Sequence, residues 1–274
     1  MTRFRFGPAL LVAFALAAGS ATAQDRPFLY NEEDFGRPVD GTELDVCIDQ
    51  RDPAWQIDEA IAREIAAVLL LDPQIHYVGG AAVTSPFDDV YYYLRAQCRV
   101  FFGFKLIAGH YPEWVAVTRA YYDANYVFVG SDPNVARLGD LPPRTAIGTT
   151  SATSADFLFL QFNNLQPTAQ RWRRIPFGTD AQTLSALESG TIAAALVWGP
   201  SLLDLTDGDA LPPDVQFIAP DPVQLSPMPV GGLLLSTDTY LRQEIDTAIV
   251  ALQAQGYLDQ LVAQYPFLSV PAAQ

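Results

Sequence analysis

Short apolar segments alternate with amphipathic ones through most of this chain, and few folds accommodate that alternation. Residues 44–48 (LDVCI) have the composition of a buried strand. Four aliphatic residues then recur at every fourth position, as on one face of a helix: Ile57, Ile61, Ile65 and Leu69. Strands that alternate with helices in this way predict an α/β fold, in which helices cover a largely parallel sheet.

The same pattern continues along the chain. We predict further strands over residues 75–78, 99–104, 126–129, 144–147, 175–177, 193–197 and 231–235. We predict helices over residues 85–96, 155–162 and 183–189, and one or two helices over residues 241–265. The apolar strand at 99–104 suits a parallel sheet that is covered on both faces.

Residues 1–23 have the pattern of a secretory signal peptide. Arg3 and Arg5 give a positive start, an apolar run covers 9–18, and residues 21–23 (ATA) form a small-x-small cleavage site. The alternative is a membrane anchor, but the apolar run has roughly half of the about 20 residues that a spanning helix needs. We therefore expect an exported, periplasmic protein of about 250 residues, whose segment 24–43 is a polar, acidic N-terminal arm.

The net charge narrows the choice of partners. The formal charge is −15 at pH 7. Nucleic acid and anionic lipid both require a positive patch, so neither is expected as a partner. A basic protein or a cation remains compatible with this charge, as does simple solubility. The length allows one large domain or two lobes of about 100 residues each.

Several short motifs occur in the order that one known family shows. They are 44–48 (LDVCI) with 58–62 (DEAIA), 94–100 (LRAQCRV), 118–122 (TRAYY) with 126–129 (YVFV), 138–141 (LGDL) with 147–150 (IGTT), and 186–190 (ALESG) with 194–197 (AALV). Taken together they resemble the family 3 extracytoplasmic solute-binding proteins. The resemblance implies a periplasmic binding protein type II-like fold, in which two lobes hold a ligand in the cleft between them. Lobe one would comprise 44–126 and 225–274, and lobe two 127–224.

Two departures from the family pattern concern the ligand. Amino-acid binders of this family carry an arginine for the ligand carboxylate where this chain has Tyr111. They carry an aspartate for the ligand ammonium where this chain has Trp198, and Ala193 replaces a further aspartate. The resemblance therefore implies a small, non-zwitterionic solute, passed to a membrane importer of the ABC type.

A narrower subgroup shares these departures. Residues 111–114 (YPEW), 197–200 (VWGP) and the positions of Cys47 and Cys98 are similar to solute-binding-type proteins associated with quinoprotein alcohol dehydrogenases. This resemblance implies an alternative function as an accessory of a pyrroloquinoline-quinone-dependent alcohol (methanol) dehydrogenase, which binds the enzyme rather than a nutrient. Arg99 stands where that subgroup has an aspartate, and the segment after Pro200 departs from its aromatic pattern.

The candidate ligand-binding residues follow strand ends or open helices, where ligands of open α/β sheets bind. Hydroxyls and free backbone N–H groups at a helix start can bind an anion, although ordinary capping explains them equally well. Trp114 and Trp198 suit an apolar wall of the cleft, or packing within a lobe. Lys105 and Arg51 suit an anionic group, or are solvated charges. The complete set is Arg51, Trp55, Lys105, Tyr111, Trp114, Thr149, Thr150, Ser151, Ser154 and Trp198, with Ser154 as the expected N-cap.

Cys47 and Cys98 are the two cysteines of the chain. In an oxidising compartment they can form a disulfide if their Cα atoms come within roughly 7 Å. Cys47 lies near the end of its predicted strand and Cys98 begins its own, so parallel neighbouring strands would set the sulfurs several residues apart. Either a disulfide or two buried thiols is compatible with the sequence.

The sequence has no pattern typical of a catalytic site. His76 and His110 are isolated, and no serine or cysteine lies in a recognisable nucleophile turn. Two cysteines and two scattered histidines do not supply a thiolate metal site. We expect neither enzymatic activity nor a bound metal or cofactor.

Overall fold

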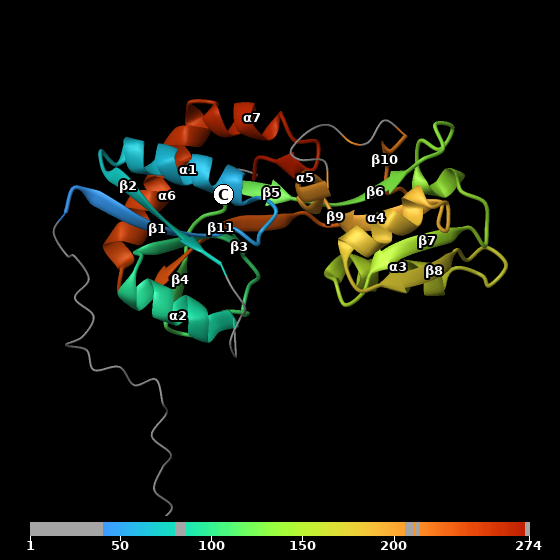
Figure 1. Ribbon diagram of the computed structural model, residues 1–274, viewed down its shortest axis with the longest axis horizontal. Coiled ribbons are helices and arrows are strands. Elements are labelled where there is room, and N and C mark those ends of the chain that lie inside the picture. The colour runs from blue at the N-terminus through green and yellow to red at the C-terminus, as the bar shows by residue number, and fades with distance from the viewer. Residues whose placement is uncertain (1–40, 80–85, 206–210, 212–213, 272–274) are drawn as a thin grey trace, which may run out of the picture. The chain divides into compact units, whose positions relative to one another are not determined.

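The computed structural model describes residues 41–79, 86–205, 211 and 214–271, which form two β-sheets with helices packed on them (Figure 1). The predicted signal peptide and the arm up to residue 40 lie outside the described residues. In the described part of the chain, no helix combines the length and the apolar character needed to cross a membrane.

The first sheet is mixed and has seven strands, in the order β12-β5-β11-β3-β1-β2 with β4 paired to β11. Its strands are β1 (Glu43–Asp49), β2 (Asp72–Val78), β3 (Val100–Lys105), β4 (Val115–Val117), β5 (Tyr122–Ala124), β11 (Met228–Leu235) and β12 (Leu268–Ser269). β1 is parallel to β2 and β3, whereas β11 is antiparallel to β3. The segment predicted to lie in a parallel sheet therefore has one parallel and one antiparallel neighbour.

Helices cover both faces of the first sheet (Figure 1). They are α1 (Trp55–Val68), α2 (Pro86–Ala96), α6 (Thr239–Ala254) and α7 (Tyr257–Val262). Leu44 and Val46 on β1 pack in one core cluster with residues of α1 and α6, whereas Cys47 packs in another with Val90 of α2. Because alternate side chains of a strand point to opposite faces, a strand covered on both faces is apolar at consecutive positions.

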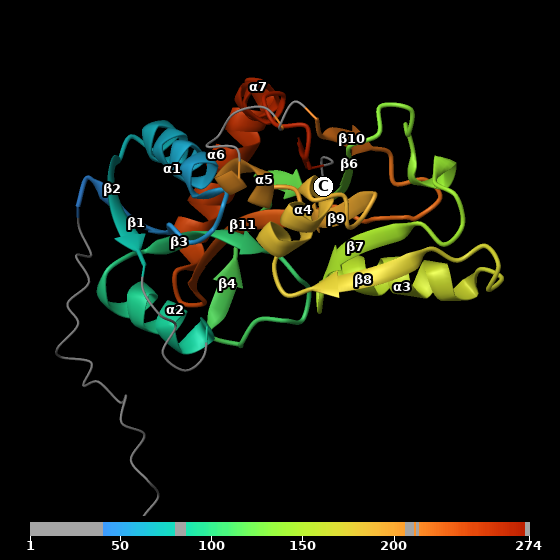
Figure 2. The same cartoon turned by 45° about the vertical axis from the view of Figure 1, so that its right-hand side comes forward.

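The second sheet has five strands in the order β10-β6-β9-β7-β8. Its elements are β6 (Tyr126–Gly130), η2 (Leu138–Asp140), β7 (Ala146–Thr150), α3 (Ser154–Leu165), β8 (Arg173–Phe177), α4 (Asp180–Glu188), β9 (Ala194–Trp198), α5 (Ser201–Leu205) and β10 (Gln216–Ile218). β7 is parallel to both β8 and β9, and Figure 2 shows β7 and β8 side by side. β6 is antiparallel to β9 and β10. Phe159 of α3 packs with Leu196 in one cluster, and Leu184 of α4 packs with Val197 in another, so both faces of β9 are buried.

The strand predicted at 144–147 corresponds to β7, which lies further along the chain, from Ala146 to Thr150. Gly148 pairs with both Ile175 and Ala195 in the sheet. A Cβ atom at Gly148 would lie 2.4 Å from the Cδ1 atom of Ile192. Close packing inside the strand therefore requires glycine at this position.

The chain passes between the sheets twice, first at Asn125 and again between Ile218 and Met228. The first passage is held by main-chain contacts. The Asn125 N–H donates to the Phe267 carbonyl at 2.9 Å, and the Gly199 N–H donates to the Asn125 carbonyl at the same distance. A Cβ atom at Gly199 would lie 2.4 Å from the Cβ of Phe267, so three distant parts of the sequence meet where only glycine fits.

Cys47 and Cys98 form a disulfide, with their Cα atoms 5.6 Å apart. Their strands are parallel neighbours, and Cys47 is aligned with Phe101 rather than with Cys98. Cys98 precedes β3, in the turn after α2, where its N–H donates to the Tyr93 carbonyl. Because this turn does not follow the strand direction, the offset expected between the two sulfurs does not arise.

Candidate functional site

Polar and aromatic side chains gather at the carboxyl ends of the parallel strands in the second sheet. Thr150 ends β7, Asp180 opens the helix that follows β8, and Trp198 ends β9. Because these strands run in the same direction, their carboxyl ends lie at one edge, which is where open α/β sheets bind ligands. This edge is therefore the first half of the candidate site.

The Asp180 carboxylate joins these strand ends. It accepts hydrogen bonds from the Ser201 hydroxyl at 2.7 Å, from the main-chain N–H of Trp198 at 3.3 Å, and from the Thr150 hydroxyl. The Thr150 hydroxyl also lies 3.2 Å from that of Thr183 on α4. Asp180 thus fixes the backbone at the end of β9 and the first residue of α5.

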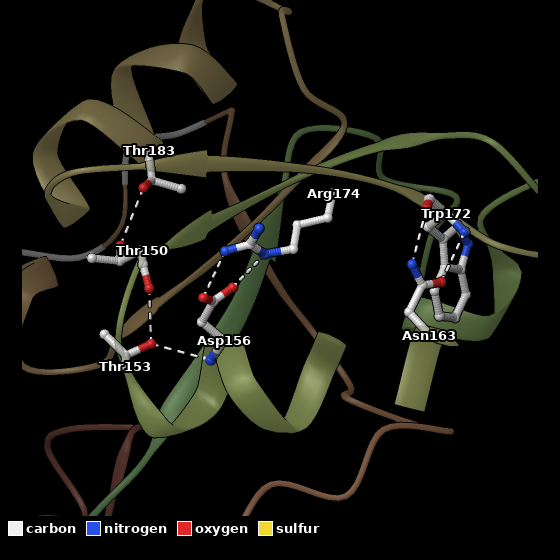
Figure 3. A network of polar contacts seen from close by, with 7 residues as sticks. All are labelled: Thr150, Thr153, Asp156, Asn163, Trp172, Arg174 and Thr183. Carbon is white, nitrogen blue, oxygen red and sulfur yellow. Dashed lines mark hydrogen bonds and ion pairs between the residues drawn. The ribbon is translucent and has the colours of Figure 1, made fainter. Parts of the chain in front are cut away.

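Beside this edge, the start of α3 is capped by Thr153 (Figure 3). The Thr153 hydroxyl accepts from the Asp156 N–H at 3.1 Å and donates to the Thr150 carbonyl at 2.9 Å. The N-cap predicted at Ser154 is therefore wrong by one residue. Thr153 has the extended backbone of a capping residue, whereas Ser154 is already the first residue of the helix.

Asp156 forms a bidentate ion pair with Arg174 of β8 (Figure 3), with N–O distances of 2.6 and 2.7 Å. Burial opposes ionisation of Asp156, but the hydrogen bonds and the charge of Arg174 act in the opposite direction, and the pKa of Asp156 is lowered. Further along α3, the Asn163 side chain donates to the Trp172 carbonyl and accepts from the Trp172 N–H, both at 3.0 Å. These contacts hold α3 against β8 and the residue that precedes it.

Replacing Arg174 by methionine should lower the free energy of unfolding by about 2 kcal/mol at pH 7, because a nearly buried carboxylate loses its partner. The pKa of Asp156 is depressed in the folded state, so the pair stabilises the fold above the unfolded-state pKa. The difference between Arg174→Met and wild type should therefore shrink as the pH falls below about 4. Urea unfolding at pH 7 and pH 3.5 measures it. The exposed neighbour Arg173, changed to methionine, is the control.

The first sheet contributes the second half of the site, again from the carboxyl ends of parallel strands. Lys105 ends β3, and Asp52 lies in the turn after β1. The Nζ atom of Lys105 lies 3.8 Å from the ring centroid of Trp198 and 5.7 Å from that of Tyr126. Burial lowers the pKa of Lys105, and the nearby charges of Asp52 and Asp180 act in the opposite direction. A lysine from one sheet thus stands over an aromatic residue of the other.

Tyr126 and Trp198 form the aromatic part of the site. They are paired in register between β6 and β9, and their ring centroids are 4.8 Å apart. Burial raises the pKa of Tyr126, and a hydrogen bond with Ser154 partly opposes that rise. Ser154 therefore lies beside Tyr126, although it does not cap the helix.

A buried acid lies on α1 near the first passage between the sheets. The hydroxyls of Tyr121 and Tyr122 donate to the Oδ1 atom of Asp58, at 2.8 and 2.9 Å. The Tyr121 hydroxyl accepts from the Gly103 N–H at 2.9 Å. Burial, followed by the charge of Asp52, raises the pKa of Asp58 to about 8, so its carboxyl is mainly protonated at neutral pH.

The other predicted site residues on the first sheet make contacts of their own. Arg51 forms an ion pair with Asp49, and the closest of its N–O distances is 2.7 Å. Trp55 packs edge-on against Tyr77. Arg51 and Trp55 both follow β1. Asp49, the partner of Arg51, ends β1, and Tyr77, the partner of Trp55, lies on β2.

Tyr111 and Trp114 lie in the segment that leads to β4. The Tyr111 hydroxyl donates to the Lys105 carbonyl at 2.5 Å, and burial raises the pKa of Tyr111 to about 12. Trp114 packs against Tyr91 of α2, with ring centroids 4.9 Å apart. Trp114 belongs to the core cluster beneath α2, whereas Trp198 belongs to the main cluster, so the two tryptophans predicted to share a wall occupy different clusters.

Of the predicted hydroxyl residues, Thr150 and Ser154 reach the site. Thr149 is fully buried beside Asp156, and Ser151 is exposed with its N–H donating to the Phe177 carbonyl. The prediction missed Asp52, Tyr126, Asp180 and Ser201. A signal was available for the two acids, because each follows a strand of the parallel set, but their sequence context resembles ordinary turn and helix-start chemistry.

Comparisons with known proteins establish the fold. No protein-family model matches the chain, and no curated protein sequence matches it significantly. Among solved structures it is similar to substrate-binding domain 2 of GlnP from Lactococcus lactis in an open conformation (15% identity, TM-score 0.63), covering 84% of this chain and 97% of that one. It is also similar to an ancestral cationic amino acid solute-binding protein (15%, 0.60), covering 82% and 95%.

A third similar structure is an arginine transport-system periplasmic binding protein from Legionella pneumophila (15% identity, TM-score 0.50), where the match covers 82% of this chain and all of that one. At this level of identity the likeness concerns the fold. The predicted periplasmic binding protein type II-like architecture, with two α/β lobes, is confirmed.

Proposed function

We propose that this chain is an exported, non-catalytic solute-binding protein that holds a small, non-zwitterionic solute between its lobes and delivers it to a membrane importer of the ABC type. The Lys105 ammonium over the faces of Trp198 and Tyr126 carries this proposal. It combines a positive charge with an apolar wall at the carboxyl ends of strands from both sheets. The named functions of the three structural neighbours support the same class of protein.

The residues that stand at the family's two charge anchors support a ligand other than an ordinary amino acid. Tyr111 has its hydroxyl committed to the Lys105 carbonyl, so it offers no charge to a ligand carboxylate. Trp198 presents an indole face where the family has a carboxylate. The solute that best suits this arrangement has an aromatic or alkyl body for Trp198 and a single anionic group for Lys105.

The test measures thermal unfolding and tryptophan fluorescence of the exported protein with aromatic and aliphatic monocarboxylates, their neutral amides and the matching amino acids. A monocarboxylate at 100 times its Kd should stabilise the fold by about 2.7 kcal/mol, and the amino acid should give much less. Trp198→Leu should abolish the response, whereas Trp114→Leu, in the cluster beneath α2, should retain it. Equal responses to the carboxylate and the amino acid would contradict a non-zwitterionic ligand.

A second candidate is an accessory of a periplasmic quinoprotein alcohol dehydrogenase. The observation that favours it is the aromatic surface of α2, where Tyr91 and Tyr92 are 42% and 39% exposed and Tyr91 contacts Trp114. Exposed aromatic residues of this kind are enriched at protein interfaces. Native mass spectrometry of protein enriched from its own periplasm separates the two candidates. A small molecule released on denaturation supports the receptor, and a complex with a large dehydrogenase subunit supports the accessory.

A further inference from the structure

We infer that the Lys105 ammonium is a tethered occupant of a cation site formed by Trp198, Tyr126, Asp52 and Asp180, and that Lys105 thereby prevents free organic cations from binding there. The inference deepens the proposed function, since it assigns the charge selectivity of the same site to one residue. The site itself would take a small alkylammonium ion once the lysine side chain is removed.

The aromatic groups of this site are arranged as a cation receptor. The Nζ atom lies 3.8 Å from the Trp198 centroid and 5.7 Å from the Tyr126 centroid, and both distances fall within the roughly 6 Å range of cation–π attraction. Trp198 is only 8% exposed, and its main-chain N–H donates to the Asp180 carboxylate. The receptor faces are therefore fixed by the sheet rather than by the lysine.

Two carboxylates supply the negative field of the site, and each is held by other groups. Asp180 accepts from Ser201, Thr150 and the Trp198 N–H, and Asp52 accepts from the Ala54 N–H at 2.8 Å. Both act on Lys105 in the direction that favours its charged form. Asp180 keeps its three donors when the ammonium is removed, so its field remains. Burial raises the pKa of Asp52 and the charge of Lys105 lowers it, so Asp52 contributes less once the lysine side chain is removed.

The backbone of Lys105 is also held independently of its ammonium group. The residue pairs with Val230 across the sheet, and its carbonyl accepts from the Tyr111 hydroxyl. Truncation of the side chain at Cβ therefore removes three methylenes and the ammonium, an n-propylammonium-like group, and leaves its surroundings in place. In the wild-type protein, that group fills the site and repels a second cation.

The experiment compares wild type, Lys105→Ala and Lys105→Met, the last of which fills the site without a charge. Each protein is titrated with n-propylammonium chloride against sodium chloride of equal ionic strength, and unfolding temperature and tryptophan fluorescence are followed. Lys105→Ala should bind at least fivefold more tightly than the other two. Its unfolding temperature should rise by about 2–4 °C at five times its Kd.

Three outcomes would overturn the inference. One is an equal response of all three proteins, and another is binding by Lys105→Met as tight as by Lys105→Ala. The third is an undiminished response of the double variant Lys105→Ala/Trp198→Leu. Circular dichroism verifies folding, and Lys105→Ser replaces the alanine variant if that variant does not fold.

The inference and the proposed function fail separately. If wild type binds a monocarboxylate but Lys105→Ala does not bind propylammonium, the tethered-cation inference is wrong and the receptor stands. If Lys105→Ala binds propylammonium but wild type binds no solute, the cation site stands and the receptor function is wrong.

Discussion

Replacing both Cys47 and Cys98 by alanine should lower the free energy of unfolding by about 4 kcal/mol. The two residues are 51 positions apart, and closing a loop of that length restricts the unfolded chain by this amount in the chain-entropy account. Both cysteines are buried in the cluster between the first sheet and α2, so the native contacts around them remain apolar after the change. Urea unfolding, monitored by circular dichroism, measures the loss.

Reduction of the wild-type protein with a thiol provides the matched control, since it breaks the bond and leaves the side chains in place. The reduced protein and the double alanine variant should unfold at similar urea concentrations. A loss below about 1 kcal/mol in both would mean that the unfolded chain is already restricted near these residues. In that case the bond contributes little to stability.

Asp58 should give this protein a stability that falls as the pH rises from about 5 to 8. The pKa of Asp58 is about 8 in the folded state, above the ordinary value of 3.8, so between these values the folded chain holds a proton that the unfolded chain has released. Stability then decreases by at most about 1.4 kcal/mol per pH unit for this one group, and the decrease ends above the folded-state pKa. In Asp58→Asn this contribution disappears, because an amide does not titrate.

The measurement is the free energy of urea unfolding of wild type and Asp58→Asn at pH 5, 6, 7 and 8. The difference between them should shift steadily in favour of the variant as the pH rises. Asp88→Asn, an exposed carboxylate on α2, is the control and should follow the wild-type curve. Parallel curves for wild type and Asp58→Asn would show that Asp58 is ionised in the folded protein.

The main strands and helices were predictable because each has enough residues to show a period. The aliphatic series Ile57, Ile61, Ile65 predicted α1, and the apolar run at 44–48 predicted β1. β4, β5 and β10 have three residues each and β12 has two, so an alternation cannot be recognised in them. Their existence depends on pairing with β11, β6 and each other, which is a tertiary property.

The candidate site was predictable only in part. Lys105 and Trp198 were expected at strand ends, and the structure places both there. Their mutual contact joins side chains of two different sheets, and no local pattern specifies such a contact. The position of the cap shows the same limit at short range, because Thr153 and Ser154 are chemically equivalent caps and only the backbone conformation selects Thr153.

The arrangement of strands has a consequence for how the chain completes its fold as it emerges during synthesis. The second sheet is built from one continuous stretch, from Tyr126 to Ile218, and can assemble before the residues after Ile218 are available. The first sheet cannot, because β11 lies between β3 and β5, and the last strand, β12, pairs with β5. We therefore expect the second sheet to form before the first. The first sheet contains the first five strands of the chain, and it cannot be completed until about the last 50 residues are available.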